Sequence, residues 1–285
     1  MKPPPFAYRD PTTLDDALAL LADDAEARPL AGGQSLMPML NFRLVRPSTV
    51  VDLNRISALA GIAVDRGGAT IGAMTRQVDA LRAPVLAEQW PLIRMALEHV
   101  GHLQTRNRGT IGGSLAHNDP AAELPAVMLA LDARMTVQRA KGARTISAQE
   151  FFVSSLTTAI VAGELLTAIH LPSPPPGAGM GFAELARRHG DFALAAAAIV
   201  VSRAGAGHAR VVVTGMGDGP QRIPAAEAAL LNGRFGEAAI AEAGAAASAA
   251  VSPIDDLHAP AWYRRKIAGV MAARAARDAI GRMAG

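Results

Sequence analysis

The stretch RNRGTIGGSLAHNDPAAELPAVMLAL, residues 106–131, contains two adjacent glycines between hydroxyl-bearing residues, followed by a polar patch and an apolar run with helical character. A second stretch, PLAGGQSLMPML at residues 29–40, repeats the glycine pair and the serine that follows it. Each segment could be an ordinary turn, or a place where bare backbone approaches a large anionic ligand. The interpretation of the chain depends on this pair.

Both turns are candidate phosphate cradles. Glycine permits positive φ and leaves backbone N–H groups unshielded, and consecutive N–H groups form a concave nest that binds phosphate. The candidate donors are Ala31, Gly32, Gly33, Gln34, Ser35 and Leu36 in the first turn and Thr110, Ile111, Gly112, Gly113 and Ser114 in the second. Two nests suit a pyrophosphate, and the lack of lysine in both predicts neutral backbone dipoles as its partners. The turns alone leave open a dinucleotide ligand or two structural turns.

The composition bounds the class of protein. The chain has 285 residues, 50% of them apolar and 19% charged, which predicts about two folded domains, or one with lobes, and no disorder. Its formal charge of +3 is small and its arginines are spread along the chain, so nucleic-acid binding is not favoured. The absence of cysteine excludes thiolate metal sites and iron–sulfur clusters held by this chain alone.

The N-terminus and the apolar segments favour a cytoplasmic protein without a membrane span. MKPPPFAYRD has no apolar core, so it does not resemble a signal peptide. No run of about 18 apolar residues lacks charge, and the alanine-rich segment 193–201 is too short to cross a bilayer.

Periodicity predicts an α+β body to about residue 176 and a smaller lobe beyond the linker SPPPGAG, residues 173–179. A capped helix is expected from residue 14 to near Asp23, and a single helix over VLAEQWPLIRMALEHVG, residues 85–101, with Gly101 as its stop. RPLAGG, residues 28–33, is expected to be a short strand that runs into a glycine turn. Further strands are expected at 48–53, 69–74, 134–139, 143–147 and 164–172, then at 181–188, 195–203 and 208–214; further helices are expected at 121–131, 225–231, 237–250 and 262–282. The last three strands predict a three-stranded C-terminal sheet.

Other functional motifs are absent or incomplete. No P-loop, no G-x-G-x-x-G and no G-x-S-x-G occurs, so the sequence predicts no catalytic side chain. Asp52 stands where a Rossmann fold places its ribose-binding acid, but Pro38 interrupts the helix such a unit requires, so this is the weakest competitor. His99 and His102 are three residues apart without a third ligand, so no metal site is predicted.

Several motifs occur in one order along the chain: AGGQSLMPMLNFRLVRPSTVVDLNRI, TIGAMT, RNRGTIGGSLAHNDPAAELPAVMLAL, GELLTAIHLP, FAELARRHGDFALAAAA and IDDLHAPAWYRRK. Together they resemble the FAD-binding medium subunit of molybdenum hydroxylases, over residues 1 to about 282. The resemblance implies an FAD-binding fold of the vanillyl-alcohol-oxidase (PCMH) type. Its two α/β subdomains, 1–57 and 58–176, would clasp FAD, and residues 177–285 would form a C-terminal flavoprotein domain.

The resemblance also implies positions for the site residues. The two glycine turns would hold the pyrophosphate of non-covalently bound FAD. Glu123 stands where an acid lies near the flavin, and Leu165 or Leu166 would pack beside the isoalloxazine. A lysine found near FAELARR in several relatives is missing, with Ala183 and Glu184 there instead, which puts a lysine contact to the flavin in doubt.

The implied function is that of an electron-exit subunit in a heterohexamer. Molybdopterin would be bound by a large partner subunit and [2Fe–2S] clusters by a small one, and electrons would reach FAD on this chain before an acceptor removes them. Two alternatives stay open: a self-contained FAD oxidase of the same fold, and a flavin-free interaction module. The organic substrate and the final acceptor are not specified by this sequence.

Overall fold

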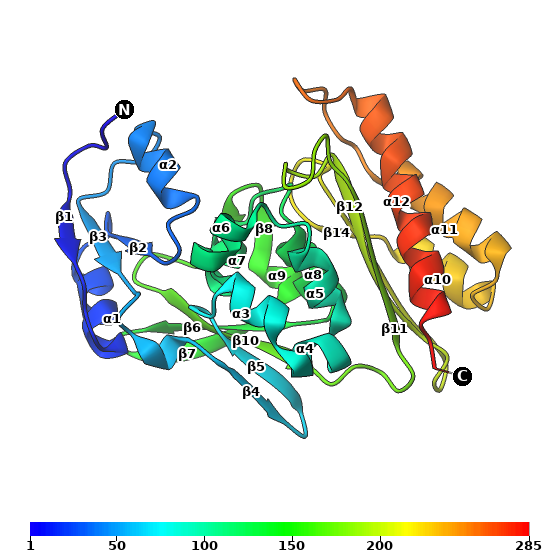
Figure 1. Ribbon diagram of the computed structural model, residues 1–285, viewed down its shortest axis with the longest axis horizontal. Helices are drawn as coiled ribbons and strands as arrows, with labels where there is room; N and C mark the ends of the chain where they lie inside the picture. The colour runs from blue at the N-terminus through cyan, green and yellow to red at the C-terminus, as the bar shows by residue number, and fades with distance from the viewer. Residues whose placement is uncertain (285) are drawn as a thin grey trace.

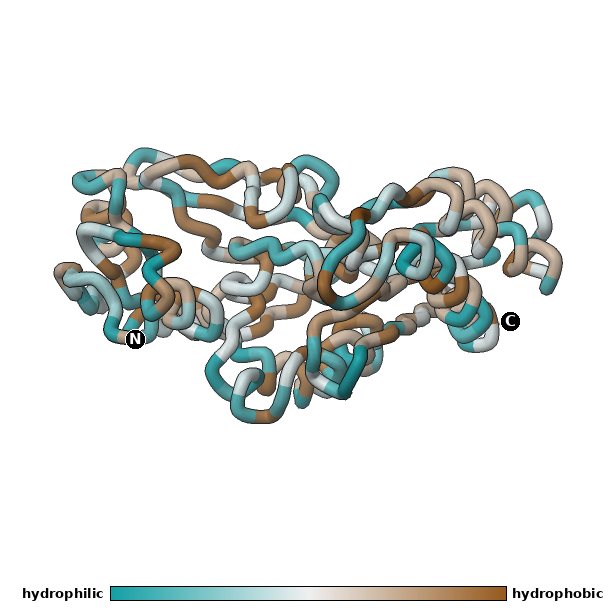
Figure 2. The backbone as a smooth tube through the Cα atoms, turned by 90° about the horizontal axis from the view of Figure 1, so that it is seen from above, coloured by the Kyte–Doolittle hydropathy of each residue, from teal (hydrophilic) through white to brown (hydrophobic). Residues whose placement is uncertain are grey.

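The computed structural model describes residues 1–284 as three parts in a row, with the two termini at opposite ends of the long axis (Figures 1 and 2). The N-terminal part contains a small parallel sheet, the middle part an antiparallel sheet covered by helices, and the C-terminal part a second antiparallel sheet with three helices. The predicted α+β class is confirmed. The boundaries at residues 57/58 and 176/177 stay a proposal.

The N-terminal part is a three-stranded parallel sheet in the order β1-β3-β2. Its elements are β1 (Ala7–Arg9), α1 (Leu14–Asp23), β2 (Arg28–Leu30), α2 (Leu36–Asn41) and β3 (Thr49–Asp52). The α1 helix begins where the sequence predicts, because the Thr13 hydroxyl accepts the Asp16 N–H at 3.2 Å. The first glycine turn is the whole connection between β2 and α2.

The middle part is a five-stranded sheet in the order β4-β5-β10-β6-β7, with its helices gathered on one side (Figure 1). Its elements are the 3₁₀ turn Ser57–Leu59, β4 (Ile62–Asp65), β5 (Gly68–Gly72), α3 (Gln77–Arg82), α4 (Pro84–Gln89), α5 (Pro91–Leu97), α6 (Leu103–Arg108), α7 (Ile111–His117), α8 (Glu123–Ala130), β6 (Arg134–Arg139), β7 (Gly142–Ser147), α9 (Ala148–Phe151), β8 (Phe152–Ser154), β9 (Thr157–Thr158) and β10 (Leu165–Pro172). Fully buried Trp90 and Phe151 are the largest side chains of its core.

The single helix expected over residues 85–101 is wrong: two helices, α4 and α5, meet at Trp90 and Pro91. Proline lacks an N–H and disfavours helical geometry in the residue before it, and Trp90 accordingly has φ −127° and ψ 57°. The break lets the Trp90 indole enter the core and donate to the Pro172 carbonyl at 2.9 Å. Gly101 lies beyond the end of α5, in a turn with φ +47°.

The C-terminal part is an antiparallel sheet in the order β11-β12-β13-β14 with three helices. Its elements are β11 (Gly179–Leu185), β12 (Ala195–Ser202), β13 (His208–Thr214), β14 (Gln221–Arg222), α10 (Pro224–Asn232), α11 (Glu237–Ala250) and α12 (Ala261–Gly281). The three expected strands are present, and a fourth, β14, joins them. With only two residues, in the segment between Pro220 and Pro224, β14 is too short to show alternation in the sequence. No helix among residues 1–284 is long and apolar enough to cross a membrane.

Strand β12 is buried on both faces. Ala196, Ala198 and Val200 pack into the core of the middle part, whereas Ala195, Ala197, Ile199 and Val201 pack against the C-terminal helices. The sheet therefore lies between the helices of the middle part and α10 to α12, as Figure 1 shows at its right.

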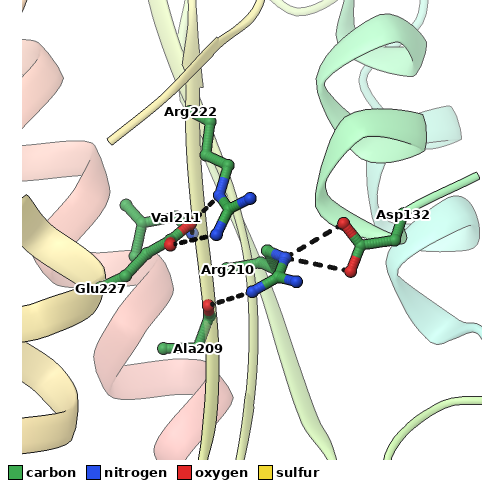
Figure 3. Close-up of polar contacts among 6 residues, drawn as sticks. All are labelled: Asp132, Ala209, Arg210, Val211, Arg222 and Glu227. Carbon is green, nitrogen blue, oxygen red and sulfur yellow. Dashed lines mark hydrogen bonds and ion pairs between the residues drawn. The ribbon is translucent and has the colours of Figure 1, made fainter. Parts of the chain in front are cut away.

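Ion pairs fasten the C-terminal sheet to its neighbours on both sides (Figure 3). The Arg210 Nε on β13 donates to both carboxylate oxygens of Asp132, which follows α8, at 3.0 Å each. On the other side, Arg222 forms a bidentate pair with Glu227 of α10, both contacts at 2.7 Å. Glu227 also accepts the Val211 N–H at 3.2 Å, so this carboxylate is fully engaged.

Candidate functional site

The two glycine turns lie side by side, although about 80 residues separate them in the sequence. A Cβ atom on Gly32 would lie 2.3 Å from the Arg108 carbonyl oxygen and 2.7 Å from the Gly109 Cα atom. A Cβ on Gly113 would lie 3.5 Å from the Ala31 Cβ atom. Only glycine at position 32 permits this approach, because any side chain would push the two backbones apart.

The first turn has a free set of backbone donors. Gly33 has φ +74°, which turns the chain from β2 into α2. Within residues 1–284 no acceptor is paired with the amides of Gly32, Gly33, Gln34, Ser35 and Leu36. The Ser35 side chain makes no capping bond. The side-chain amide of Gln34 donates through Nε2 to the Gly32 carbonyl at 3.2 Å. Unpaired backbone N–H groups require a partner, so this turn fits an anionic ligand.

The second turn does not offer the predicted nest. The Ile111 N–H donates to the Thr75 carbonyl at 2.9 Å and the Gly112 N–H to the Ala73 carbonyl at 2.8 Å. The Gly113 N–H donates to the Thr110 hydroxyl at 3.0 Å, and the Ser114 N–H bonds the Thr110 carbonyl at 3.2 Å. The expectation that these amides are free is therefore wrong. Thr110 is a helix cap, and the glycines dock α7 onto the chain after β5.

The second turn still contributes position. Thr110 is buried, and Gly112 packs so closely that a Cβ there would lie 2.5 Å from the Ala73 Cβ. The partly buried Ser114 side chain makes no hydrogen bond within the described residues, so its hydroxyl is the group this turn can offer a ligand. The second turn is thus closely packed and supports the first turn, which lies directly against it.

Arg76 links the two turns, and the sequence alone did not indicate this link. The Arg76 guanidinium donates through Nη1 to the Arg108 carbonyl and through Nη2 to the Asn54 side-chain oxygen. Asn54 in turn donates to the Ala31 carbonyl at 3.0 Å. Burial, and then the charge of Arg108, lower the Arg76 pKa. The expectation of a purely neutral phosphate site is therefore corrected, because a cation stands beside the first turn. The sequence feature that could have indicated Arg76 is the segment TIGAMTR, in which Arg76 follows the end of β5.

The two leucines proposed to flank the flavin point to opposite sides of β10. Leu165 packs in a cluster with Leu18, Met74 and other residues between the N-terminal and middle parts. Leu166 packs in the core of the middle part. Both are buried, with 5% and 4% of their surface exposed. Leu165 is thus the better placed of the two to reach the junction where the glycine turns meet, and its contact with FAD stays a prediction.

Family models and known structures match nearly the whole chain. Residues 4–174 match the FAD binding domain in molybdopterin dehydrogenase, and residues 181–279 match the CO dehydrogenase flavoprotein C-terminal domain. The chain is therefore an FAD-binding medium chain of the molybdenum hydroxylase family. The resemblance inferred from the glycine motifs is confirmed.

Relatives of this medium chain align along its full length. The chain is 41% identical to the 6-hydroxypseudooxynicotine dehydrogenase complex subunit alpha of Paenarthrobacter nicotinovorans, covering 99% of this chain and 97% of that protein. It is 39% identical to the carbon monoxide dehydrogenase medium chain of Afipia carboxidovorans, covering 99% of each. A solved structure of carbon monoxide dehydrogenase from Hydrogenophaga pseudoflava, lacking the Mo-pyranopterin moiety, superposes with a TM-score of 0.96 at 37% identity, covering 100% of both chains.

Two buried carboxyl groups distinguish the interior of this medium chain. Glu123, in the first turn of α8, is 6% exposed, and burial raises its pKa to about 7. Glu184 on β11 has a 2% exposed side chain, and burial followed by the charge of Glu123 raises its pKa to about 8. The structure thus brings together Glu123, predicted from the resemblance, and Glu184, noted only as a departure from it. The role of Glu123 beside the flavin stays a prediction.

The histidine pair does not form a metal site. His99 lies after α5 and approaches Glu184, whereas exposed His102 caps α6 and lies near His189, with ring centroids 6.5 Å apart. Among residues 1–284 no group of three or more metal-ligating side chains is found.

Proposed function

We propose that this chain is the FAD-carrying electron-transfer subunit of a multi-subunit molybdenum hydroxylase. Electrons would come from [2Fe–2S] clusters on a small partner subunit and leave from FAD to an external acceptor. Molybdopterin would be held by a large partner subunit. The absence of cysteine from this chain agrees with clusters held elsewhere. The observation that carries the proposal is the first glycine turn, whose free amides lie directly against the second turn.

In this proposal the residues of the chain bind and orient, and bound FAD supplies the one- and two-electron chemistry. The five free amides from Gly32 to Leu36 and the Ser35 hydroxyl would hold the diphosphate. Arg76 would add positive potential and keep the two turns together. Leu165 and Glu123 would face the ring system, from β10 and from the start of α8. Among residues 1–284 we assign no side chain a covalent role.

The partner arrangement is supported by the relatives of the chain. The chain covers 97% of a dehydrogenase complex subunit alpha and 99% and 100% of two carbon monoxide dehydrogenase medium chains. The organic substrate would be bound by the large subunit.

The experiment is purification of the full chain with FAD and measurement of flavin retention. We expect a yellow protein with one FAD per chain, and loss of FAD in Gly33→Val. A branched side chain at φ +74° costs about 1–3 kcal/mol and distorts the amides. Gly281→Ala is the matched control, since a Cβ there meets nothing within 4 Å. A folded wild-type chain without affinity for FAD would refute the proposal.

Electron transfer requires the complex. Co-expression with candidate large and small subunits, followed by anaerobic addition of reducing substrate, should bleach the flavin bands of the complex. The isolated chain should not respond to the same substrate. Bleaching of the isolated chain would instead indicate a self-contained dehydrogenase.

A further inference from the structure

Glu184 is a buried acid that the fold leaves unsatisfied. Its side chain is 2% exposed, and its Oε2 atom is buried without a hydrogen-bond partner among residues 1–284. Its Oε1 atom lies 3.7 Å from the Nδ1 atom of His99. A buried carboxylate with no donor is costly, so the group is more stable with a proton. If Glu184 had only a structural role, we would expect the fold to pair it with a hydrogen-bond donor. Glu164 and Glu227 are paired in this way with Arg144 and Arg222.

Glu123 is the second acid of this group. The charged form of its carboxylate is stabilised by its own backbone N–H, and burial and the charge of Asp119 oppose that form. The charge of Glu123 in turn raises the Glu184 pKa. The pKa values of the two acids, about 7 and about 8, are thus both raised into the neutral range, and the two acids titrate as a coupled pair.

His99 connects Glu184 to solvent. The His99 side chain is 38% exposed. Its ring packs against Phe182 of β11, the strand that also carries Glu184, with ring centroids 5.4 Å apart. Burial and then His189 lower its pKa, and Glu98 opposes them, so the ring is neutral at pH 7. A neutral imidazole accepts a proton at one nitrogen while releasing one from the other. His99 thus links buried Glu184 to the surface, and Glu184 is coupled by charge to Glu123 at the start of α8.

We propose that His99, Glu184 and Glu123 form a proton port for the flavin site. This inference rests on the proposed function, because electrons from iron–sulfur clusters arrive without protons and a flavin that accepts a pair must also take up protons. Glu123 releases its proton to the flavin site, and Glu184 then gives its own proton to the ionised Glu123. The ionised Glu184 takes the Nδ1 proton of His99 while His99 Nε2 binds a proton from solvent, and no residue of the port changes its oxidation state.

The geometry permits the transfer with small movements. The 3.7 Å between His99 and Glu184 exceeds an ordinary hydrogen bond by roughly 0.5 Å, which a side-chain rotation removes. The exposed edge of His99 gives the port one entrance. Glu123 lies at its inner end, on the helix that follows α7 and the second glycine turn.

The first test needs no FAD. Infrared spectra of the full chain with carbon-13 glutamate should show protonated carboxylic acid at pH 7, and Glu184→Gln should remove the part of this band that belongs to Glu184 and leave the part that belongs to Glu123. Since the folded-state pKa of Glu184 is raised, its stabilising contribution is present below pH 4.5 and is lost as the pH rises through about 8. The wild-type chain should therefore lose stability across that window more steeply than Glu184→Gln. Absence of the acid band at pH 7 would overturn the port.

The second test measures proton uptake with an indicator dye while light-driven reduction delivers electrons to the bound flavin. We expect uptake to slow at least tenfold in Glu184→Gln and in His99→Gly, with free imidazole restoring the latter. His258→Gln, in an exposed loop far along the chain, is the control. Unchanged uptake in both variants would overturn the port. A wild-type chain that binds no FAD would instead refute the proposed function, and the infrared result would still decide the protonation of Glu184.

Discussion

The AGGQS and TIGGS turns have nearly the same composition and opposite hydrogen bonding. In the first, the amides from Gly32 to Leu36 have no acceptor within residues 1–284. In the second, the amides from Ile111 to Ser114 are all paired with the protein. In the proposed function the first turn would therefore be the donor, and the second the support that holds it. Glycine would serve ligand contact at the first turn, and it serves backbone packing at the second.

The largest effect on stability should come from a substitution that crowds the second turn. Gly112→Val places its new side chain against Ala73, where even a Cβ would lie 2.5 Å from the neighbouring Cβ. We expect a loss of about 3 kcal/mol or more in the free energy of unfolding, measured by urea denaturation without FAD. Gly281→Ala should leave the urea midpoint unchanged. A stable Gly112→Val protein that merely lost FAD would show that the second turn is a ligand site rather than a support.

An intermediate effect should follow from removing a donor of the first turn. Ser35→Ala deletes a hydroxyl that makes no bond within the described protein, so the fold should keep its stability. Loss of one charge-assisted hydrogen bond, about 1.5 kcal/mol, predicts roughly tenfold weaker FAD binding, measured by flavin fluorescence titration. Unchanged affinity would place the diphosphate away from Ser35.

The smallest effect should follow from removing the cap of the second turn. Thr110→Val keeps the buried shape but loses the hydroxyl that accepts the Gly113 N–H at 3.0 Å. We expect about 1 kcal/mol less stability in urea, with FAD affinity changed less than in Ser35→Ala. A larger loss of affinity than in Ser35→Ala would reverse the assigned roles of the two turns.

Local signals in the sequence were enough for most of the fold. Thr13 followed by Asp16 marks the start of α1, and β13 and α11 follow from short-range pattern and propensity. The family resemblance supplied the architecture that joins them. Apolar periodicity continues across Trp90 and does not show the break that Pro91 causes there.

The site was harder to predict, because its chemistry depends on partners distant in sequence. The acceptors that occupy the second turn are carbonyls of Ala73 and Thr75, which no pattern around TIGGS reveals. Arg76 likewise acquires its role only when Asn54 and Arg108 are brought beside it. Glu184 was visible as a departure from the family, but its burial and its contact with His99 come from the packing of β11.

The double burial of β12 determines how the molecule can move. Because alternate residues of one strand belong to two hydrophobic cores, the C-terminal sheet cannot swing away without exposing apolar surface on both sides. The Asp132–Arg210 pair fastens the same junction from its rim. The middle part and the C-terminal part are therefore mechanically coupled, and a force applied to α12 would be transmitted to β11, the strand that carries Glu184.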